Sequence, residues 1–209
     1  MRRDATADAA ARYAEVRARS EALCAPLAIE DHVVQPVVDV SPPKWHLAHT
    51  SWFFEAMLLA HASPGYAPFH PAYGYLFNSY YEGEGERVPR AQRGHLSRPT
   101  VAEVLAYRAH VDAAVMAWLA TQPPARWLDR LALGLQHEQQ HQELLLTDIK
   151  AILGHNPLRP AYACADTAVV SLAGEHLPQA APMGWLEHPG GVVAIGHAGD
   201  GFAFDNEGA

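Results

Sequence analysis

The 209-residue sequence has little cysteine, little lysine and no long apolar run. Its two cysteines, Cys24 and Cys164, form no close-spaced motif, so we expect reduced thiols rather than a disulfide framework. No stretch approaches the roughly 18–20 apolar residues that a transmembrane helix requires. The first residues are polar and lack the apolar region of a signal peptide, so the sequence predicts a cytoplasmic protein without a membrane partner.

Acidic residues outnumber basic ones by 23 to 15, and the formal net charge is −8. Binding to phosphate backbones depends on clustered Lys and Arg, so this charge argues against a nucleic-acid partner. Apolar residues make up 49% of the chain, whose length suits one packed domain and a smaller second unit. The composition is therefore that of an ordinary globular protein.

Apolar periodicity predicts four main helices, over about residues 6–24, 43–61, 100–120 and 124–153. Thr100 precedes Glu103 by three residues, which is the capping-box pattern of a helix start. Gly154 is expected just beyond the end of the last helix. Short connections favour antiparallel neighbours, so the predicted fold class is mainly α, a four-helix bundle.

The sequence changes character after residue 154. Prolines and alanines punctuate residues 155–183, and short β-like runs lie at 169–172, 191–195 and 201–204. Such a tail is too short to build a core of its own. We therefore expect a short β-containing C-terminal tail that either packs on the bundle or begins a further domain.

Prolines and glycines interrupt the helical pattern throughout residues 62–99. A loop of this length inside a compact domain is usually functional or disordered, and its aromatic residues argue for order. It carries four arginines, Arg87, Arg90, Arg93 and Arg98, and the planar guanidinium suits carboxylate recognition. A solvated basic loop edge explains the same composition equally well.

Two histidines, His137 and His141, lie four residues apart in the last predicted helix. Residues at this spacing share a helix face, about 5–6 Å apart at Cβ, so both imidazoles can converge on one metal ion. Imidazole suits zinc, copper, iron and nickel. A polar pair on a half-buried face is the structural alternative. The candidate third ligand is His49, which shares its helix face with aromatic residues and should point into the core. His46 is the competitor, and we interpret it as a supporting or surface residue.

The same stretch reads His-Glu-x-x-His, the pattern of zinc metalloproteases with Glu138 as general base. The extension of that motif by a third histidine fails, because position 144 is Leu144. Glu143 follows too closely to be a separate downstream ligand. A metal site built in the bundle core from facing helices fits better, and a zinc hydrolase is the alternative hypothesis.

Five runs of sequence carry a family resemblance: SPPKWHLAHTSWFFE at 41–55, FNSYYE at 77–82, RAQRG at 90–94, LSRPT at 96–100 and GLQHEQQH at 134–141. Together they resemble the sulfoxide synthases of ergothioneine biosynthesis. These hercynine oxygenases have an N-terminal DinB-like four-helix bundle and a C-terminal formylglycine-generating-enzyme-like (sulfatase-modifying-factor) domain. The runs at 189–196 and 201–207 look like the opening of that second domain, so the resemblance covers essentially the whole chain.

The resemblance implies three parts in this chain. A DinB-like metal-binding bundle is expected at 1–155, a linker at 156–183, and an incomplete start of the formylglycine-generating-enzyme-like domain at 184–209. The family's catalytic tyrosine belongs to that second domain. We therefore expect no catalytic residue in this chain, poor or no activity by itself, and the rest of that domain as a partner.

The resemblance also implies iron(II) as the cofactor, with His49, His137 and His141 as its ligands. Gln140 resembles the family's contact to hercynine (Nα-trimethylhistidine). Arg90 and Arg93, in the run at 90–94, match the arginine pair that holds carboxylates of the thiol donor. Arg87, just before that run, is the alternative. The implied substrates are hercynine, γ-glutamylcysteine or cysteine, and O2.

Three other functions stay open from the sequence. An ovothiol-type 5-histidylcysteine sulfoxide synthase shares the two-domain core, and neither the thiol donor nor the regiochemistry is distinguished. A DinB-like module could bind a metal or a partner without catalysis. A zinc hydrolase could use the His-Glu-x-x-His stretch.

Overall fold

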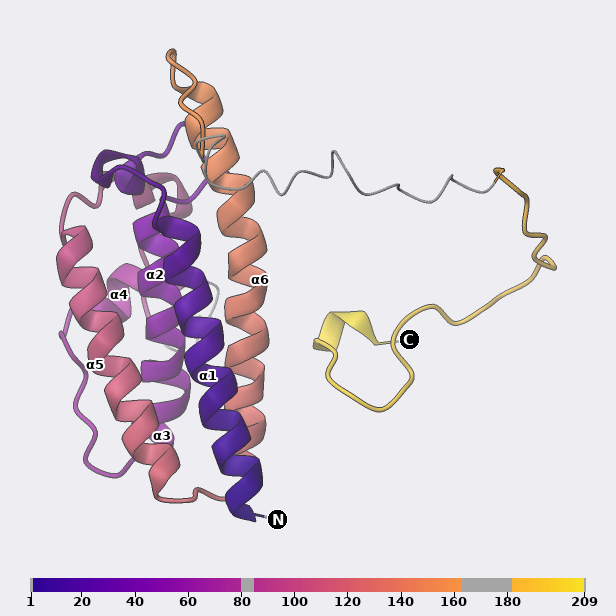
Figure 1. Cartoon of the computed structure of the whole chain (residues 1–209), viewed down its shortest axis with the longest axis horizontal. Coiled ribbons are helices and arrows are strands. Elements are labelled where there is room, and N and C mark those ends of the chain that lie inside the picture. Colours follow the sequence, from indigo (N-terminus) through magenta and orange to yellow (C-terminus); the bar gives the residue numbers. More distant parts are fainter. Residues whose placement is uncertain (1, 80–84, 163–181, 209) are drawn as a thin grey trace, which may run out of the picture. The chain divides into compact units, whose positions relative to one another are not determined.

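The computed structural model describes residues 2–79, 85–162 and 182–208, and the chain divides into two units, Met1–Ala168 and Val169–Ala209. The long helices of the first unit lie side by side around one core (Figure 1). The prediction of a mainly α fold is confirmed. The α-helices are α1 (Arg2–Cys24), α2 (Pro43–Trp52), α3 (Ala60–Ala62), α4 (Tyr73–Phe77), α5 (Val101–Ala120) and α6 (Ala125–His155).

The helix predicted over 43–61 forms in three connected pieces. α2 runs directly into a π-helical segment, Phe53–Leu59, and this continues into α3. π-helical turns are rare and occur frequently at functional sites. Here the wider turn begins just after α2, and Phe53 and Phe54 within it are buried. Apolar periodicity had predicted one regular helix through this stretch.

The predicted start of α5 is confirmed, whereas the predicted end of α6 is wrong. The Thr100 hydroxyl accepts a hydrogen bond from the Glu103 N–H at 3.2 Å, and the Glu103 carboxylate accepts one from the Thr100 N–H at 2.6 Å. α6 continues through Gly154 to His155. The helix ends where Asn156 adopts extended backbone, as a residue preceding proline favours.

The long loop between α3 and α5 is ordered where the structure describes it. Tyr73 and Phe77 of the short helix α4 are 5% and 1% exposed and belong to the central hydrophobic core. Further along the loop, a 3-10 helix spans Arg90–His95, and Arg93 within it is buried. The prediction of order from the loop's aromatic residues is therefore confirmed for these residues.

Gly134 lets α6 approach the π-helical segment closely. A Cβ added at Gly134 would lie 2.5 Å from Cε1 of Phe54, whose ring is fully buried and packs edge-on against Tyr13 at 5.0 Å. Alanine is normally favoured over glycine in a helix by about 1 kcal/mol. Forcing an extra carbon into a packed core costs about 1–3 kcal/mol, so the cost of the clash should exceed the gain in helix propensity.

We therefore expect Gly134→Ala to lower the free energy of unfolding by up to about 2 kcal/mol. Gly154→Ala is the matched control on the same helix, because a Cβ there meets nothing within 4 Å. That variant should be neutral or more stable by up to about 1 kcal/mol. Urea unfolding of both variants measures the difference. Stabilisation by Gly134→Ala would contradict the close approach of the two helices.

The described part of the second unit, residues 182–208, is mostly exposed and contains little regular structure. His197 and Gly208 form an isolated β-bridge, with the His197 N–H donating to the Glu207 carbonyl at 2.7 Å. A 3-10 turn spans Asp205–Glu207. The β-like runs predicted at 191–195 and 201–204 are not confirmed as strands. The run predicted at 169–172 lies outside the described residues.

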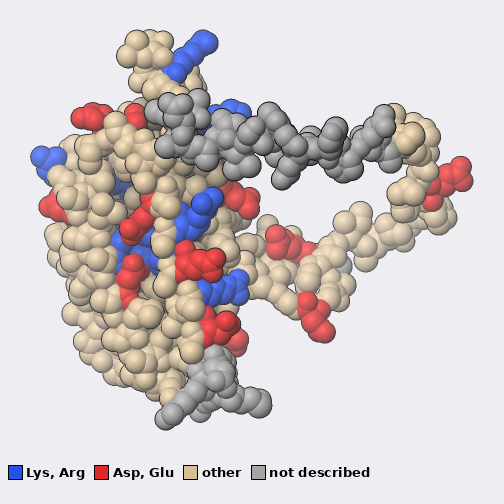
Figure 2. Space-filling view, in the orientation of Figure 1, with Lys and Arg blue, Asp and Glu red and all other residues tan. Residues whose placement is uncertain are grey.

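On the surface drawn in Figure 2, acidic and basic side chains are interspersed over the helical unit. Among the described residues, no helix combines the length and the apolar character that crossing a membrane requires.

Candidate metal centre

Three histidines from two helices meet inside the first unit. α2 contributes His49, and α6 contributes His137 and His141, which lie one helical turn apart. One donor nitrogen of each ring lies within 4.8 Å of the donors of the other two. The ring centroids are 5.1 Å apart for His49 and His137, 4.7 Å for His49 and His141, and 4.6 Å for the α6 pair. The structure thus brings together the three histidines predicted as ligands.

Aromatic rings hold two of these imidazoles in place. His49 is stacked between Trp45 and Trp52, with centroids 4.5 and 5.5 Å away and interplanar angles of 12° and 14°. These tryptophans stand four residues before and three residues after His49, which is the spacing of neighbours on one helix face. Phe53 stacks on His137 at 4.5 Å. The prediction that His49 points into the core is confirmed, since it is 1% exposed.

Burial keeps the three imidazoles neutral at ordinary pH. Desolvation lowers the pKa of His49 and of His141 well below the usual value, and it lowers the pKa of His137 to about 4. For His49 and His141, repulsion from the neighbouring rings lowers the pKa further. A histidine ligand must offer a neutral nitrogen lone pair. The cluster can therefore accept a cation at neutral pH without first losing protons.

The hydrogen bonds of the rings fit a metal-binding role. His49 Nδ1 lies 2.6 Å from the Phe77 carbonyl oxygen, which can only accept, so Nδ1 carries the proton and Nε2 the lone pair. Ligating histidines commonly donate their second N–H to a carbonyl in this way. His137 Nδ1 is buried without a hydrogen-bond partner among the described residues, which is unusual for a polar atom. Three neutral imidazoles suit zinc, copper, iron or nickel.

His46, the competitor for the third ligand position, lies beside the cluster. It is 4% exposed, so its interpretation as a surface residue is wrong. Its Nδ1 lies 2.9 Å from Nδ1 of His141, and its Nε2 lies 2.8 Å from a carboxylate oxygen of Asp148. Of the two interpretations made from the sequence, the supporting contact is the one found.

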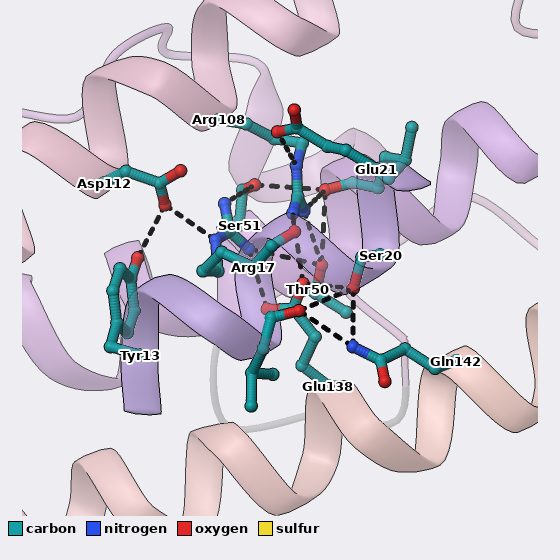
Figure 3. A network of polar contacts seen from close by, with 12 residues as sticks. Tyr13, Arg17, Ser20, Glu21, Thr50, Ser51, Arg108, Asp112, Glu138 and Gln142 are labelled. Atoms are coloured by element: carbon teal, nitrogen blue, oxygen red, sulfur yellow. Dashed lines mark hydrogen bonds and ion pairs between the residues drawn. The ribbon is translucent and has the colours of Figure 1, made fainter. Parts of the chain in front are cut away.

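Glu138 lies in a buried polar network between α6, α1 and α5 (Figure 3). Its carboxylate accepts hydrogen bonds from Arg17 at 2.9 Å, Arg108 at 3.1 Å and Ser20 at 2.7 Å, and the residue is 0% exposed. Burial alone would raise the pKa of Glu138, but the two arginines and the serine hydroxyl lower it to about 2. A carboxylate held in this way is a weak base, which argues against a His-Glu-x-x-His hydrolase.

The histidines line a cavity of about 280 Å³ together with Gln140, Arg90 and Arg93. The Arg93 guanidinium lies 3.4 Å from the centre of the Trp45 ring and donates to two serine hydroxyls at 2.9 and 3.0 Å. Arg90 donates to the Asp39 backbone carbonyl, in the segment before α2. Arg87, the weaker alternative, lines a neighbouring cavity that Arg90 and Arg93 share. The predicted substrate-binding residues therefore surround the same cavity as the predicted ligands.

Sequence reasoning missed Asp148, which lines this cavity and is 8% exposed. It follows His141 by seven residues on α6, and two helical turns return to the same face, so periodicity could have indicated it. The partners of Glu138 were also missed. Arg17 and Arg108 stand on other helices, and no spacing rule connects them to Glu138.

A family model described as DinB superfamily matches residues 12–145, a range that includes all three histidines of the cluster. No curated protein matches the sequence.

Proposed function

Since the chain belongs to the DinB superfamily, we propose that it is the iron(II)-binding part of an O2-dependent sulfoxide synthase of ergothioneine biosynthesis. The proposed reaction joins the thiol of γ-glutamylcysteine or cysteine to hercynine. The observation that carries the proposal is that His49, His137 and His141 line one cavity with Gln140, Arg90 and Arg93. Metal ligands and groups suited to carboxylates thus face the same space (six residues from three segments of the chain).

Three protein ligands leave coordination positions of a divalent ion open to small molecules. Iron(II), when bound, supplies one-electron chemistry and the activation of O2. The surrounding residues hold the ligands rigidly: two tryptophans sandwich His49, and Phe53 covers His137. A fixed ligand geometry needs such support from packing.

The proposed task of Arg93 and Arg90 is to bind carboxylates of the thiol donor. Arginine presents a planar fork that matches a carboxylate, and stacking on Trp45 fixes the plane of the Arg93 guanidinium. Gln140 stands between the two α6 ligands, and its amide can both donate and accept a hydrogen bond. We assign it to the imidazole substrate.

Binding of thiols to the metal-loaded protein tests the proposal. Cobalt(II) is a suitable probe, because a thiolate bound to it gives a new absorption band. Under anaerobic conditions we expect γ-glutamylcysteine and cysteamine, a thiol without a carboxylate, both to produce this band. Arg93→Gln should weaken γ-glutamylcysteine binding by about ten- to a hundredfold, since a charged hydrogen bond contributes about 1.5–3 kcal/mol. The affinity for cysteamine should stay the same.

Arg126→Gln is the matched control for this experiment. Arg126 also lies over a tryptophan ring, at 5.7 Å from Trp127, but it is exposed and outside the cavity. Its substitution should leave both affinities unchanged. If no thiol alters the spectrum of the cobalt-loaded protein, the chain is a metal-binding module without this substrate class.

A further inference from the structure

A chain of contacts leads from His141, which is half-buried, through His46 to a buried carboxylate. His141 Nδ1 lies 2.9 Å from His46 Nδ1, and His46 Nε2 lies 2.8 Å from Asp148 Oδ2. The same oxygen of Asp148 also accepts the Ser41 N–H at 2.9 Å. His46 and Asp148 are 4% and 8% exposed. The contacts tie α2 to α6 directly beside the histidine cluster.

The donors and acceptors along this chain follow from its carboxylate end. An ionised carboxylate only accepts, so Nε2 of His46 donates to Asp148. A neutral imidazole has one N–H, which leaves Nδ1 of His46 as an acceptor. The nitrogen that faces it must then donate, so His141 carries its proton on Nδ1 and its lone pair on Nε2.

We propose that Asp148 and His46 are positioning residues that fix the tautomer and orientation of His141, so that its Nε2 is presented to the metal. The inference rests on the proposed metal site. His46 would then do for His141 what the Phe77 carbonyl does for His49. In both cases Nδ1–H donates a hydrogen bond, and Nε2 is left free to bind the metal.

The position of His141 explains why side chains are needed for this role. His141 lies in the interior of the 31-residue helix α6, where backbone carbonyls accept the N–H groups one turn further on. A loop carbonyl such as that of Phe77 reaches His49, whereas the acceptor for His141 is a ring on α2. An imidazole can either donate or accept, so Asp148 is required to make His46 an acceptor.

Three variants test the proposal with zinc alone as the probe. His46→Phe removes the acceptor while keeping a ring, and Asp148→Leu removes the carboxylate while keeping similar size. His46→Asn is the conservative variant, because its amide oxygen can take the place of Nδ1. We expect the first two to bind zinc about 10–100-fold more weakly, as loss of a ligand's hydrogen-bond partner typically does. The asparagine variant should retain most of the wild-type affinity.

Nuclear magnetic resonance of metal-free protein with 15N-labelled histidine measures the tautomer of each ring. It therefore distinguishes residues that fix the tautomer of His141 from residues that only stabilise the fold. In the wild type, long-range 1H–15N correlations should report the Nδ1–H tautomer for His141 and His49, and the Nε2–H tautomer for His46. In Asp148→Leu, the preference of His46 should be lost. Thermal unfolding of the metal-free variants shows whether each one folds.

The outcomes separate this inference from the metal site on which it rests. An Nδ1–H tautomer at His46 in the wild type would overturn the inference. So would wild-type zinc affinity in a folded His46→Phe variant. If the wild type itself binds no zinc, the proposed metal site fails, and the tautomers of His46 and His141 still decide whether the chain of contacts works as described. If one variant does not fold, the other and the wild-type spectra decide.

Discussion

Replacing His137 with alanine is expected to weaken the binding of zinc or cobalt(II) by more than about a hundredfold. Loss of a hydrogen-bond partner of a ligand typically costs 10–100-fold in affinity, so loss of the ligand itself should cost more. The remaining two imidazoles would form a weak site. The same loss is expected for His49 and His141, because one nitrogen of each lies within 4.8 Å of the others.

His49→Phe is the sharper variant at the α2 position. A phenyl ring can keep the stack between Trp45 and Trp52, so the variant removes the nitrogen with little change in packing. Competition with a chromophoric chelator measures the affinity of each variant. His155→Ala is the control, because His155 is exposed near the end of α6 and its Nδ1 contacts only the Ala151 carbonyl among the described residues.

One result would contradict the three-histidine site. If His49→Phe binds metal as tightly as the wild type while His137→Ala does not, the metal is held by α6 alone. The predicted convergence of two helices on one ion would then be wrong, whatever the packing of His49.

The second large effect is expected on stability rather than on metal binding. Glu138→Gln should lower the free energy of unfolding by about 3 kcal/mol, because it removes the fully buried carboxylate that Arg17 and Arg108 share. The carboxylates that remain beside them, Asp112 and Glu21, are partly exposed to solvent and compensate the buried charges less well. Domains of this kind are stable by only about 5–15 kcal/mol, so the variant loses a large share of the total. Urea unfolding at pH 7 measures the change. Glu143→Gln, an exposed position on α6, is the control and should be nearly neutral.

The pH dependence of stability gives a second readout for Glu138. Its pKa is about 2 in the folded protein, below the ordinary value of 4.5 for the side chain. The contribution of Glu138 is therefore complete above about pH 4.5 and is lost as the pH falls from there towards 2. The wild type should lose more stability than Glu138→Gln over this range. Equal losses would show that the carboxylate is not held by the two arginines as described.

The sequence predicted the long helices well because their signals are local. The 3.6-residue periodicity and the Thr100 capping box act within a turn or two, and both are found in the structure. The predicted end at Gly154 was wrong because glycine is tolerated inside a helix, and the stronger stop is Pro157. The π-helical turn at Phe53–Leu59 was not predicted, since the same apolar residues fit a regular helix.

The candidate site was predicted in part for the same reason. The pairing of His137 with His141 follows from helical spacing alone, and His49 was selected by its aromatic helix face and by resemblance. Glu138 shows the limit of a motif: it stands in a His-Glu-x-x-His pattern, yet its side chain lies between two arginines from other helices. A local pattern cannot tell which face of α6 each neighbour covers.

By itself, the sequence determined the helices, the face of α6 that carries two histidines, and the inward direction of His49. Only the tertiary structure decided that the two helices meet, that His46 links His141 to Asp148, and that Glu138 belongs to a buried ion network. The physical reason is that helix formation depends on residues within a few positions of one another. The contacts that define the site join residues 28–121 positions apart, and packing of the whole core brings them together.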